Sequence, residues 1–243
     1  MPESTDFKEL ARRYGLPPVP DSVLQLTEMV ARQDSDLGEI AQLIDREPAL
    51  KTRLLRLANP AAATEADYDL DTVEGALFQK GIGFALLLAM GTPLAFALAR
   101  TFQTMLGLKL EMVDTRRLKP IEPPFVLGSI GFAGKAAGAV CLRMTDAHAA
   151  VIAARILGLD PKEVTEPSEI NDAIGELLNI ITGNFKSHLC DAGLDCRLQP
   201  PRVWRASEFF TESVRGGGLE RMAFRAGELL LFVDVTVNPW NDE

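Results

Sequence analysis

The chain has 243 residues, and its hydrophobic content of 47% is enough for a core in one or two domains. A net charge of −9 at pH 7 disfavours binding to the phosphate backbone of nucleic acids. The cysteines are odd in number and form no Cys-x-x-Cys pair, which disfavours a disulfide framework and a thiolate zinc site.

Neither the first residues nor the most apolar stretch of the chain is typical of export or membrane insertion. The first residues lack the basic and apolar regions of a signal peptide. Residues 84–98 are apolar, but Gly91-Thr92-Pro93 interrupts them, and we expect this run to be too short to span a bilayer. We therefore expect a soluble, cytoplasmic protein.

Helical periodicity dominates residues 7–88. After a proline-rich entry, Asp21 or Ser22 can cap a helix with an apolar stripe at Val23, Leu26, Met29 and Val30. Further helices are expected to start at 34–36, at Pro48 and at 71–74, with a loop at 61–70.

Four segments of this region resemble the start of an HDOD domain. They are Leu16-Pro17-Pro18-Val19-Pro20, Ile44-Asp45-Arg46-Glu47-Pro48-Ala49-Leu50, Leu54-Leu55-Arg56-Leu57-Ala58-Asn59 and Val73-Glu74-Gly75-Ala76-Leu77. HDOD domains are non-catalytic relatives of the HD phosphohydrolases and are usually longer, so residues 1–88 are interpreted as a truncated HDOD-like helical region. This region has no histidine and cannot form an HD-type metal site.

Residues 89–243 mix helices and strands, and we interpret them as a second domain. We expect a helix at 94–106, strands at 126–132 and 138–144 joined by a turn at 133–135, and a helix from an Asp146 cap to Gly158. A long helix should open at Pro167-Ser168 and be followed by Gly193. Strands are expected at 202–206, 222–225 and 229–237, with a loop at 215–218 and a turn at 226–228.

The expected long helix is largely apolar but carries a polar stripe along one side. Its members fall within about 80° of one another around the helix axis: Asp172, Glu176, Asn179, Gly183 and Lys186. The opposite face is apolar and should be buried, with Ile170, Ile174, Leu177, Leu178, Ile181 and Phe185. A simple solvent-facing stripe is the alternative to a functional site.

The spacing Asp-x-x-x-Glu-x-x-Asn, followed by Pro200-Pro201, resembles the signature of the CheC/CheX/FliY phosphatases. These enzymes remove phosphate from CheY-type response regulators. Three other segments resemble the CheX helix end and first hairpin, in family order: 102–108, 130–134 and 138–142. The resemblance covers roughly residues 90–240. It implies an α+β fold in which a mainly antiparallel sheet is covered by long helices.

The resemblance also implies roles for the stripe. Asn179 would orient the attacking water, and Glu176 would dock the lysine of a phosphorylated CheY-like response regulator. Asp172 would give support or contact the partner, and Gly183 would keep the approach clear. No cofactor is expected on this chain, because the magnesium belongs to the partner receiver domain. Two alternatives stay open: a module that binds a receiver without hydrolysis, and a signalling adaptor that works through the HDOD-like helices.

Assembly and the remaining polar residues are also open to interpretation. CheX relatives commonly dimerise through their sheets, and the apolar run 229–233 would need a neighbour if it were an edge. We therefore expect a homodimer, although a central strand explains the run equally well. His148 and His188 are isolated, and His188 is interpreted as structural. Asp234 is interpreted as a solvated residue.

Overall fold

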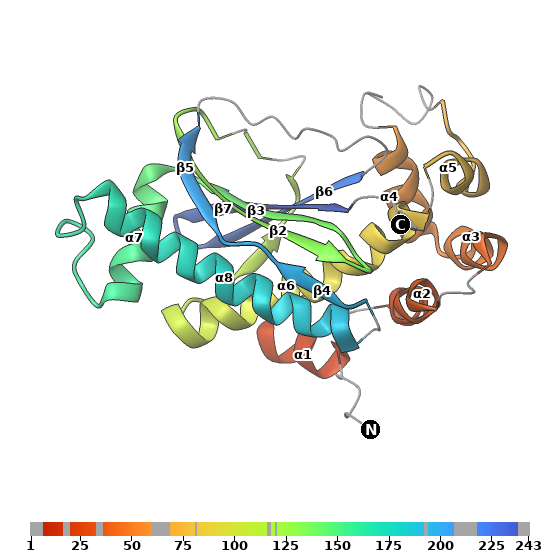
Figure 1. The fold of residues 1–243 in the computed structure, drawn as a ribbon, viewed down its shortest axis with the longest axis horizontal. Helices are drawn as coiled ribbons and strands as arrows, with labels where there is room; N and C mark the ends of the chain where they lie inside the picture. The colour runs from red at the N-terminus through yellow and green to blue at the C-terminus, as the bar shows by residue number, and fades with distance from the viewer. Residues whose placement is uncertain are drawn as a thin grey trace.

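The computed structural model describes residues 7–16, 20–32, 36–59, 69–80, 82–115, 118–119, 121–191, 194–206 and 218–237. Over these residues the fold is α+β, as expected. A seven-stranded sheet carries long helices on one face, and a group of shorter helices lies beside them. Figure 1 shows this arrangement, with α2 to α5 at the right, α1 at the bottom centre, and α7 and α8 at the left and centre.

The N-terminal region is helical, as predicted from its periodicity. It contains α1 (Phe7–Tyr14), α2 (Asp21–Ala31), α3 (Leu37–Arg46), α4 (Pro48–Ala58) and α5 (Val73–Lys80). Asp36 caps α3 by accepting a hydrogen bond from the Gly38 amide at 2.9 Å, and Pro48 occupies the first turn of α4. The expected cap of α2 is wrong, because Pro20 holds that position and Asp21 is already helical. Most of the expected loop at 61–70 lies outside the described residues.

The helix α6 (Ile82–Leu106) is longer than the sequence suggested. The expected interruption at Gly91-Thr92-Pro93 is wrong, since the helix continues through Pro93. The proline removes one backbone donor, but α6 packs against α1, α2, α4 and α5. It also packs against the helices α7 (Asp146–Leu157) and α8 (Pro167–Asp191) and the strands β6 (Gly218–Ala226) and β7 (Leu229–Val237). Burial on so many sides stabilises the helix beyond the local cost of the proline.

The length and composition of α6 would also allow it to cross a membrane, contrary to our expectation from residues 84–98. However, 89% of its apolar window is buried inside the fold. Such burial is typical of the core helix of a soluble protein. The domain boundary that we placed after residue 88 falls inside this helix, and the division into two domains stays a prediction.

The sheet is antiparallel, with the order β1-β6-β7-β3-β2-β4, and β5 also pairs with β2. Its strands are β1 (Glu111–Val113), β2 (Phe125–Gly134), β3 (Gly138–Met144), β4 (Cys196–Leu198), β5 (Arg202–Ala206), β6 (Gly218–Ala226) and β7 (Leu229–Val237). The five expected strands are present, as β2, β3, β5, β6 and β7. β6 begins earlier than predicted, and the sequence analysis missed the short strands β1 and β4.

β7 is a central strand, because it pairs with β3 on one side and β6 on the other. β6 pairs with the whole apolar run 229–233, and β3 pairs with its last two residues, so β7 is a central strand, as in the alternative interpretation of this run. The homodimer stays a prediction, without the argument from an exposed edge.

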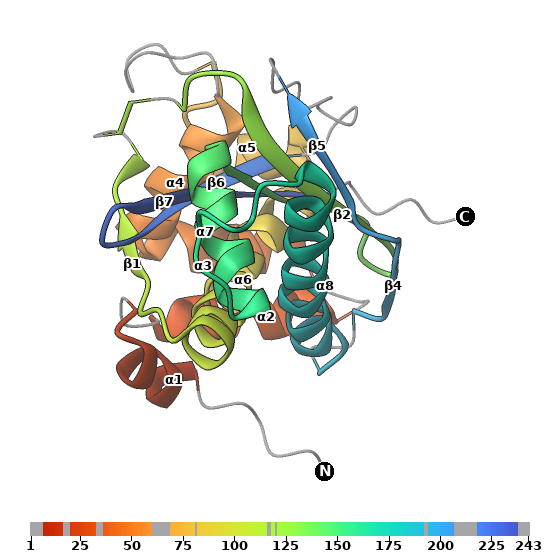
Figure 2. The same cartoon turned by 90° about the vertical axis from the view of Figure 1, so that its left-hand side faces the viewer.

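The helices α7 (Asp146–Leu157) and α8 (Pro167–Asp191) pack against each other on the same face of the sheet. Figure 2 shows them side by side, with α6 beside and below them. Thr145, rather than Asp146, caps α7 by accepting from the His148 amide at 3.2 Å. Gly158 ends this helix as predicted, with a φ of 69°. The predicted roles of Gly193 and of residues 215–217 lie outside the described residues.

Asp234 is buried rather than solvated, with 1% of its surface exposed. Arg221 donates from Nε to Asp234 Oδ1 at 2.6 Å and from Nη2 to Oδ2 at 3.1 Å. Burial raises the pKa of this carboxyl, and the bonds from Arg221 oppose that shift. The prediction failed because strand alternation identifies the two faces of β7 but does not say whether the second is covered. Here a smaller apolar cluster includes Phe232, which shares that face of β7 with Asp234.

An ion pair connects the N-terminal helices to the sheet. Arg53 of α4 donates from Nη2 to Oε1 of Glu220 on β6, whose side chain is 11% exposed. Burial raises the pKa of Glu220, and the adjacent Arg53 charge opposes this rise. Gly91 of α6 leaves room for the pair, because a Cβ there would lie within 3.0 Å of atoms of both side chains. Three elements thus meet at one buried pair of charges.

We predict that Arg53→Ala destabilises the protein, because it leaves the Glu220 carboxylate buried without its partner. Loss of one partner from a fully buried pair costs roughly 3–5 kcal/mol, and we expect about 2 kcal/mol here because Arg53 is partly exposed. The free energy of unfolding in urea measures the effect. Lys51→Ala is the control. Lys51 lies in α4, like Arg53, and its ion pair with Asp45 of α3 is exposed. Equal losses for the two variants would contradict the prediction.

Candidate functional site

The polar stripe lies on the outer face of α8. Asp172, Glu176 and Asn179 are exposed, while Gly183 and Lys186 are partly exposed. The opposite face is buried against the rest of the fold, with Ile170, Ala173, Ile174, Leu177, Leu178, Ile181, Phe185 and Leu189. Helical periodicity therefore predicted both faces correctly. A carboxylate and a carboxamide stand one helical turn apart, open to an approaching molecule.

Glycines let α8 lie close to the sheet. A Cβ on Gly128 of β2 would be 3.3 Å from Leu178 Cδ2 and 3.4 Å from Ile174 Cγ2. Gly175 faces Pro201 and Val203, where a Cβ would meet both at 3.8 Å. A Cβ at Gly128 would need the Leu178 and Ile174 side chains to give by a few tenths of an ångström, whereas one at Gly175 would make ordinary contacts. The close fit sets how far the stripe stands from the sheet.

Hydrogen bonds hold α8 on either side of residues 172–183, the part of the stripe that includes Glu176 and Asn179. Before it, Arg205 of β5 donates from Nη1 to Asn171 Oδ1 and from Nε to Asp146 Oδ1 at 2.9 Å. After it, Asn184 donates from Nδ2 to Thr101 Oγ1 of α6 at 3.3 Å. These residues were not predicted from the sequence. No local pattern signals them, because each partner comes from a distant part of the chain.

Gly183 has open space above it. A Cβ at this position would meet no atom within 4 Å, so its own fold does not require a glycine here. The residue lies within α8 at a helical backbone conformation, where glycine is less favourable than alanine. The open space is compatible with the predicted role of Gly183, which is to keep the approach of another protein surface clear.

The two histidines lie in partly buried positions. His148 Nδ1 is 3.1 Å from the carbonyl oxygen of Leu230, which joins α7 to β7. His188 lies on α8, and its burial lowers its pKa below the usual value. Among the described residues, no group of three His, Cys, Asp or Glu side chains is arranged to hold a metal ion.

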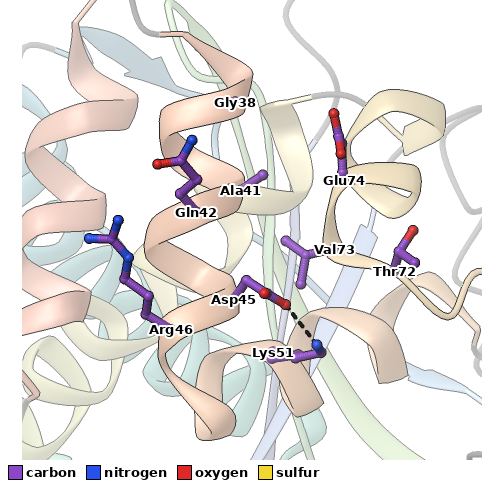
Figure 3. Close-up of a pocket in the computed structure, with 9 residues that line it drawn as sticks. All are labelled: Gly38, Ala41, Gln42, Asp45, Arg46, Lys51, Thr72, Val73 and Glu74. Carbon is purple, nitrogen blue, oxygen red and sulfur yellow. Dashed lines mark hydrogen bonds and ion pairs between the residues drawn. The ribbon is translucent and has the colours of Figure 1, made fainter.

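A polar pocket lies elsewhere, between α3, α4 and α5. Its volume is about 500 Å³, and Lys51 donates to Asp45 at 2.7 Å within it. Figure 3 shows the lining side chains: Gly38, Ala41, Gln42, Asp45, Arg46, Lys51, Thr72, Val73 and Glu74. No residue of the stripe contributes to this pocket.

Each of the two regions of the chain matches a protein family. Residues 126–218, which include the stripe, match the family described as chemotaxis phosphatase CheX. Residues 16–113 match the HDOD domain. The chain joins an HDOD-like region to a CheX-like domain. The suspected resemblances are therefore confirmed, and the HDOD match extends through α6 into β1, beyond the region that the sequence analysis recognised.

Solved structures agree with this assignment of the CheX-like domain. A chemotaxis protein CheX from Vibrio vulnificus is 25% identical with a TM-score of 0.51, covering 61% of this chain and 96% of that one. CheX from Desulfovibrio desulfuricans is 18% identical with a TM-score of 0.51, covering 61% and 99%. A CheC-like superfamily protein from Shewanella sp. PV-4 is 23% identical with a TM-score of 0.52, covering 61% and 97%. The sequence matched no curated protein.

We predict that Gly183→Ala stabilises the fold, by up to about 1 kcal/mol, because alanine favours the helix and its methyl group meets no neighbour. Thermal unfolding measures the change. Gly128→Ala is the contrasting variant, since its methyl group would press against Leu178 and Ile174 and should lower the melting temperature. A lower melting temperature for Gly183→Ala would show that this position is constrained by the fold itself.

Proposed function

We propose that this protein hydrolyses the aspartyl phosphate of a CheY-like response regulator in the cytoplasm. The observation that carries the proposal is the exposure of Glu176 and Asn179, one turn apart, on the helix inside the CheX-matching region. The family assignment supports a phosphatase, and the open stripe gives a receiver domain access to the two side chains.

The proposed reaction needs little from this chain. The phosphorylated receiver brings its own aspartyl phosphate, lysine and magnesium, as the resemblance implies. Water attacks phosphorus in line with the bond to the aspartyl oxygen, that bond breaks, and inorganic phosphate and the free carboxylate result. Asn179 would orient the water through its carboxamide. An uncharged amide suits this role, since a carboxylate would repel the phosphoryl oxygens.

The other stripe residues serve docking in this proposal. Glu176 pairs with the receiver lysine and sets the register of the complex. Asp172, one turn earlier, supports the helix end or contacts the partner, and Gly183 keeps the next turn free of side-chain bulk. The exposure of Asp172 and Glu176 and the open space at Gly183 are compatible with these roles.

A signalling adaptor is the second candidate function. Its support comes from the HDOD-like helices, where the polar pocket lies and where Phe78 of α5 is 87% exposed. An adaptor would bind a receiver or another partner without need of the carboxamide. Retention of both Glu176 and Asn179 on the stripe favours the phosphatase.

We predict that Asn179→Ala lowers receiver dephosphorylation by a factor of about 100 or more, because a residue that places the water acts mainly in the transition state. Loss of label from a phosphorylated CheY-like receiver measures the rate, and titration with the receiver measures binding. Binding and melting temperature should change little, since the side chain is exposed. Gln103→Ala, which removes an exposed carboxamide from α6, is the matched control. A receiver that binds but keeps its phosphate with the unaltered protein would instead identify a binding module.

We predict that Glu176→Ala weakens receiver binding as well as turnover, because the charge pair positions both partners in a closing interface. Glu176→Gln should be nearly as poor, since it keeps the shape and loses the charge. The matched control is Glu169→Gln, an exposed glutamate in the first turn of the same helix. If all three variants bound the receiver as tightly as the unaltered protein, Glu176 would have no docking role.

A further inference from the structure

Two asparagines bracket the part of the polar stripe of α8 that runs from Asp172 to Gly183. Asn171 lies one residue before Asp172, and Asn184 lies one residue after Gly183. Both side chains are partly buried, and each forms a hydrogen bond with a different neighbouring element. We infer that Asn171 and Asn184 are positioning residues, which fix the rotation of α8 and so the direction in which Glu176 and Asn179 point. This inference rests on the proposed function.

The first contact ties α8 to the edge of the sheet and to α7. The guanidinium of Arg205 bonds Asn171 through Nη1 and Asp146 through Nε, and the Arg205 side chain is 27% exposed. Its planar fork of donors holds three elements in one geometry. Asp146 is the first residue of α7, so α7, α8 and β5 are joined at one point.

The second contact ties α8 to α6. The Thr101 hydroxyl is 1% exposed and donates to the Ala97 carbonyl oxygen at 2.7 Å, so its oxygen is held in place to accept from Asn184. A single hydroxyl can donate one bond and accept another, and both uses are made here.

The two contacts lie on different flanks of α8. Thirteen positions separate the asparagines, which at about 100° per residue places them roughly 140° apart around the helix. The apolar face between them is held by close packing, and each hydrogen bond adds a preferred direction on its own flank. A bond on each flank therefore opposes rotation of the stripe in either direction.

Rotation of α8 would affect catalysis because the Asn179 carboxamide must lie within hydrogen-bond distance of the attacking water. A misplacement of about 1 Å can lower a rate by a factor of about 100, even when it originates far from the reacting atoms. Small rotations of α8 would move the Asn179 carboxamide at the end of its side chain. These rotations would disturb the placement of the attacking water more than the affinity for the receiver, because receiver contacts are spread over the whole stripe.

The test uses the full chain and a matched pair of variants at Thr101. Thr101→Val keeps the shape and removes the hydroxyl, whereas Thr101→Ser keeps the hydroxyl. We expect Thr101→Val and Asn184→Ala to lower kcat with a phosphorylated CheY-like receiver by about tenfold. KM and the affinity for a beryllofluoride-loaded receiver should change less than threefold. Thr101→Ser should retain most of the activity.

The other end of the stripe is tested with Arg205→Lys and Asn171→Ala. Lysine keeps the charge but lacks the fork, so we expect both variants to lower kcat in the same way. Combining Asn171→Ala with Arg205→Lys should then lower kcat little further, because the two residues share one interaction. A role in stability alone would lower the melting temperature of these variants and leave kcat unchanged at temperatures where they are folded. That result would overturn the inference.

Amide hydrogen exchange along α8 separates this inference from the proposed function. Loss of either tie should speed exchange in α8 at least severalfold relative to α7. If the unaltered protein hydrolysed no receiver phosphate, the proposed function would fail, and unchanged exchange in the variants would overturn the positioning role as well. Faster exchange confined to α8 would support the two ties independently of any activity.

Discussion

The structure depends on the burial of α6. This helix of 25 residues lies between the N-terminal helices and the sheet, and its side chains from Ala85 to Ala99 are nearly all buried. Because it contacts α1, α2, α4 and α5 as well as α7, α8, β6 and β7, neither group of elements can complete its core without it. The buried apolar area on both sides outweighs the cost of a proline in the middle of the helix.

Periodicity predicted α8 and its stripe because the information was local. In an amphipathic helix, apolar residues three or four positions apart mark the buried face. Ile174, Leu178 and Phe185 follow this spacing and are buried. The strands β2, β3, β5 and β7 were also predictable, since turns or glycines mark their ends. β1 and β4 have three residues each, too few for a pattern to emerge.

The errors share a physical cause, which is that tertiary contacts decided the outcome. Pro93 reads as a break in isolation, but packing on several sides keeps the helix intact. Asp234 reads as solvated because alternate strand residues are often exposed, but it is buried, shares its face of β7 with Phe232 and bonds Arg221. Arg205 and Thr101 carry no local signal at all, since their partners Asn171 and Asn184 are distant in the sequence.

The contacts of α6 also determine how the HDOD-like region relates to the candidate site. Thr101, which bonds Asn184 of α8, lies on the same helix that α2, α4 and α5 pack against. Gly91, further along that helix, makes room for the Arg53–Glu220 pair between α4 and β6. A close-packed helix transmits displacement instead of absorbing it. The N-terminal helices and the stripe-bearing helix α8 therefore both pack against α6. A shift of α6 caused by the N-terminal helices would be transmitted to the stripe through the hydrogen bond to Asn184.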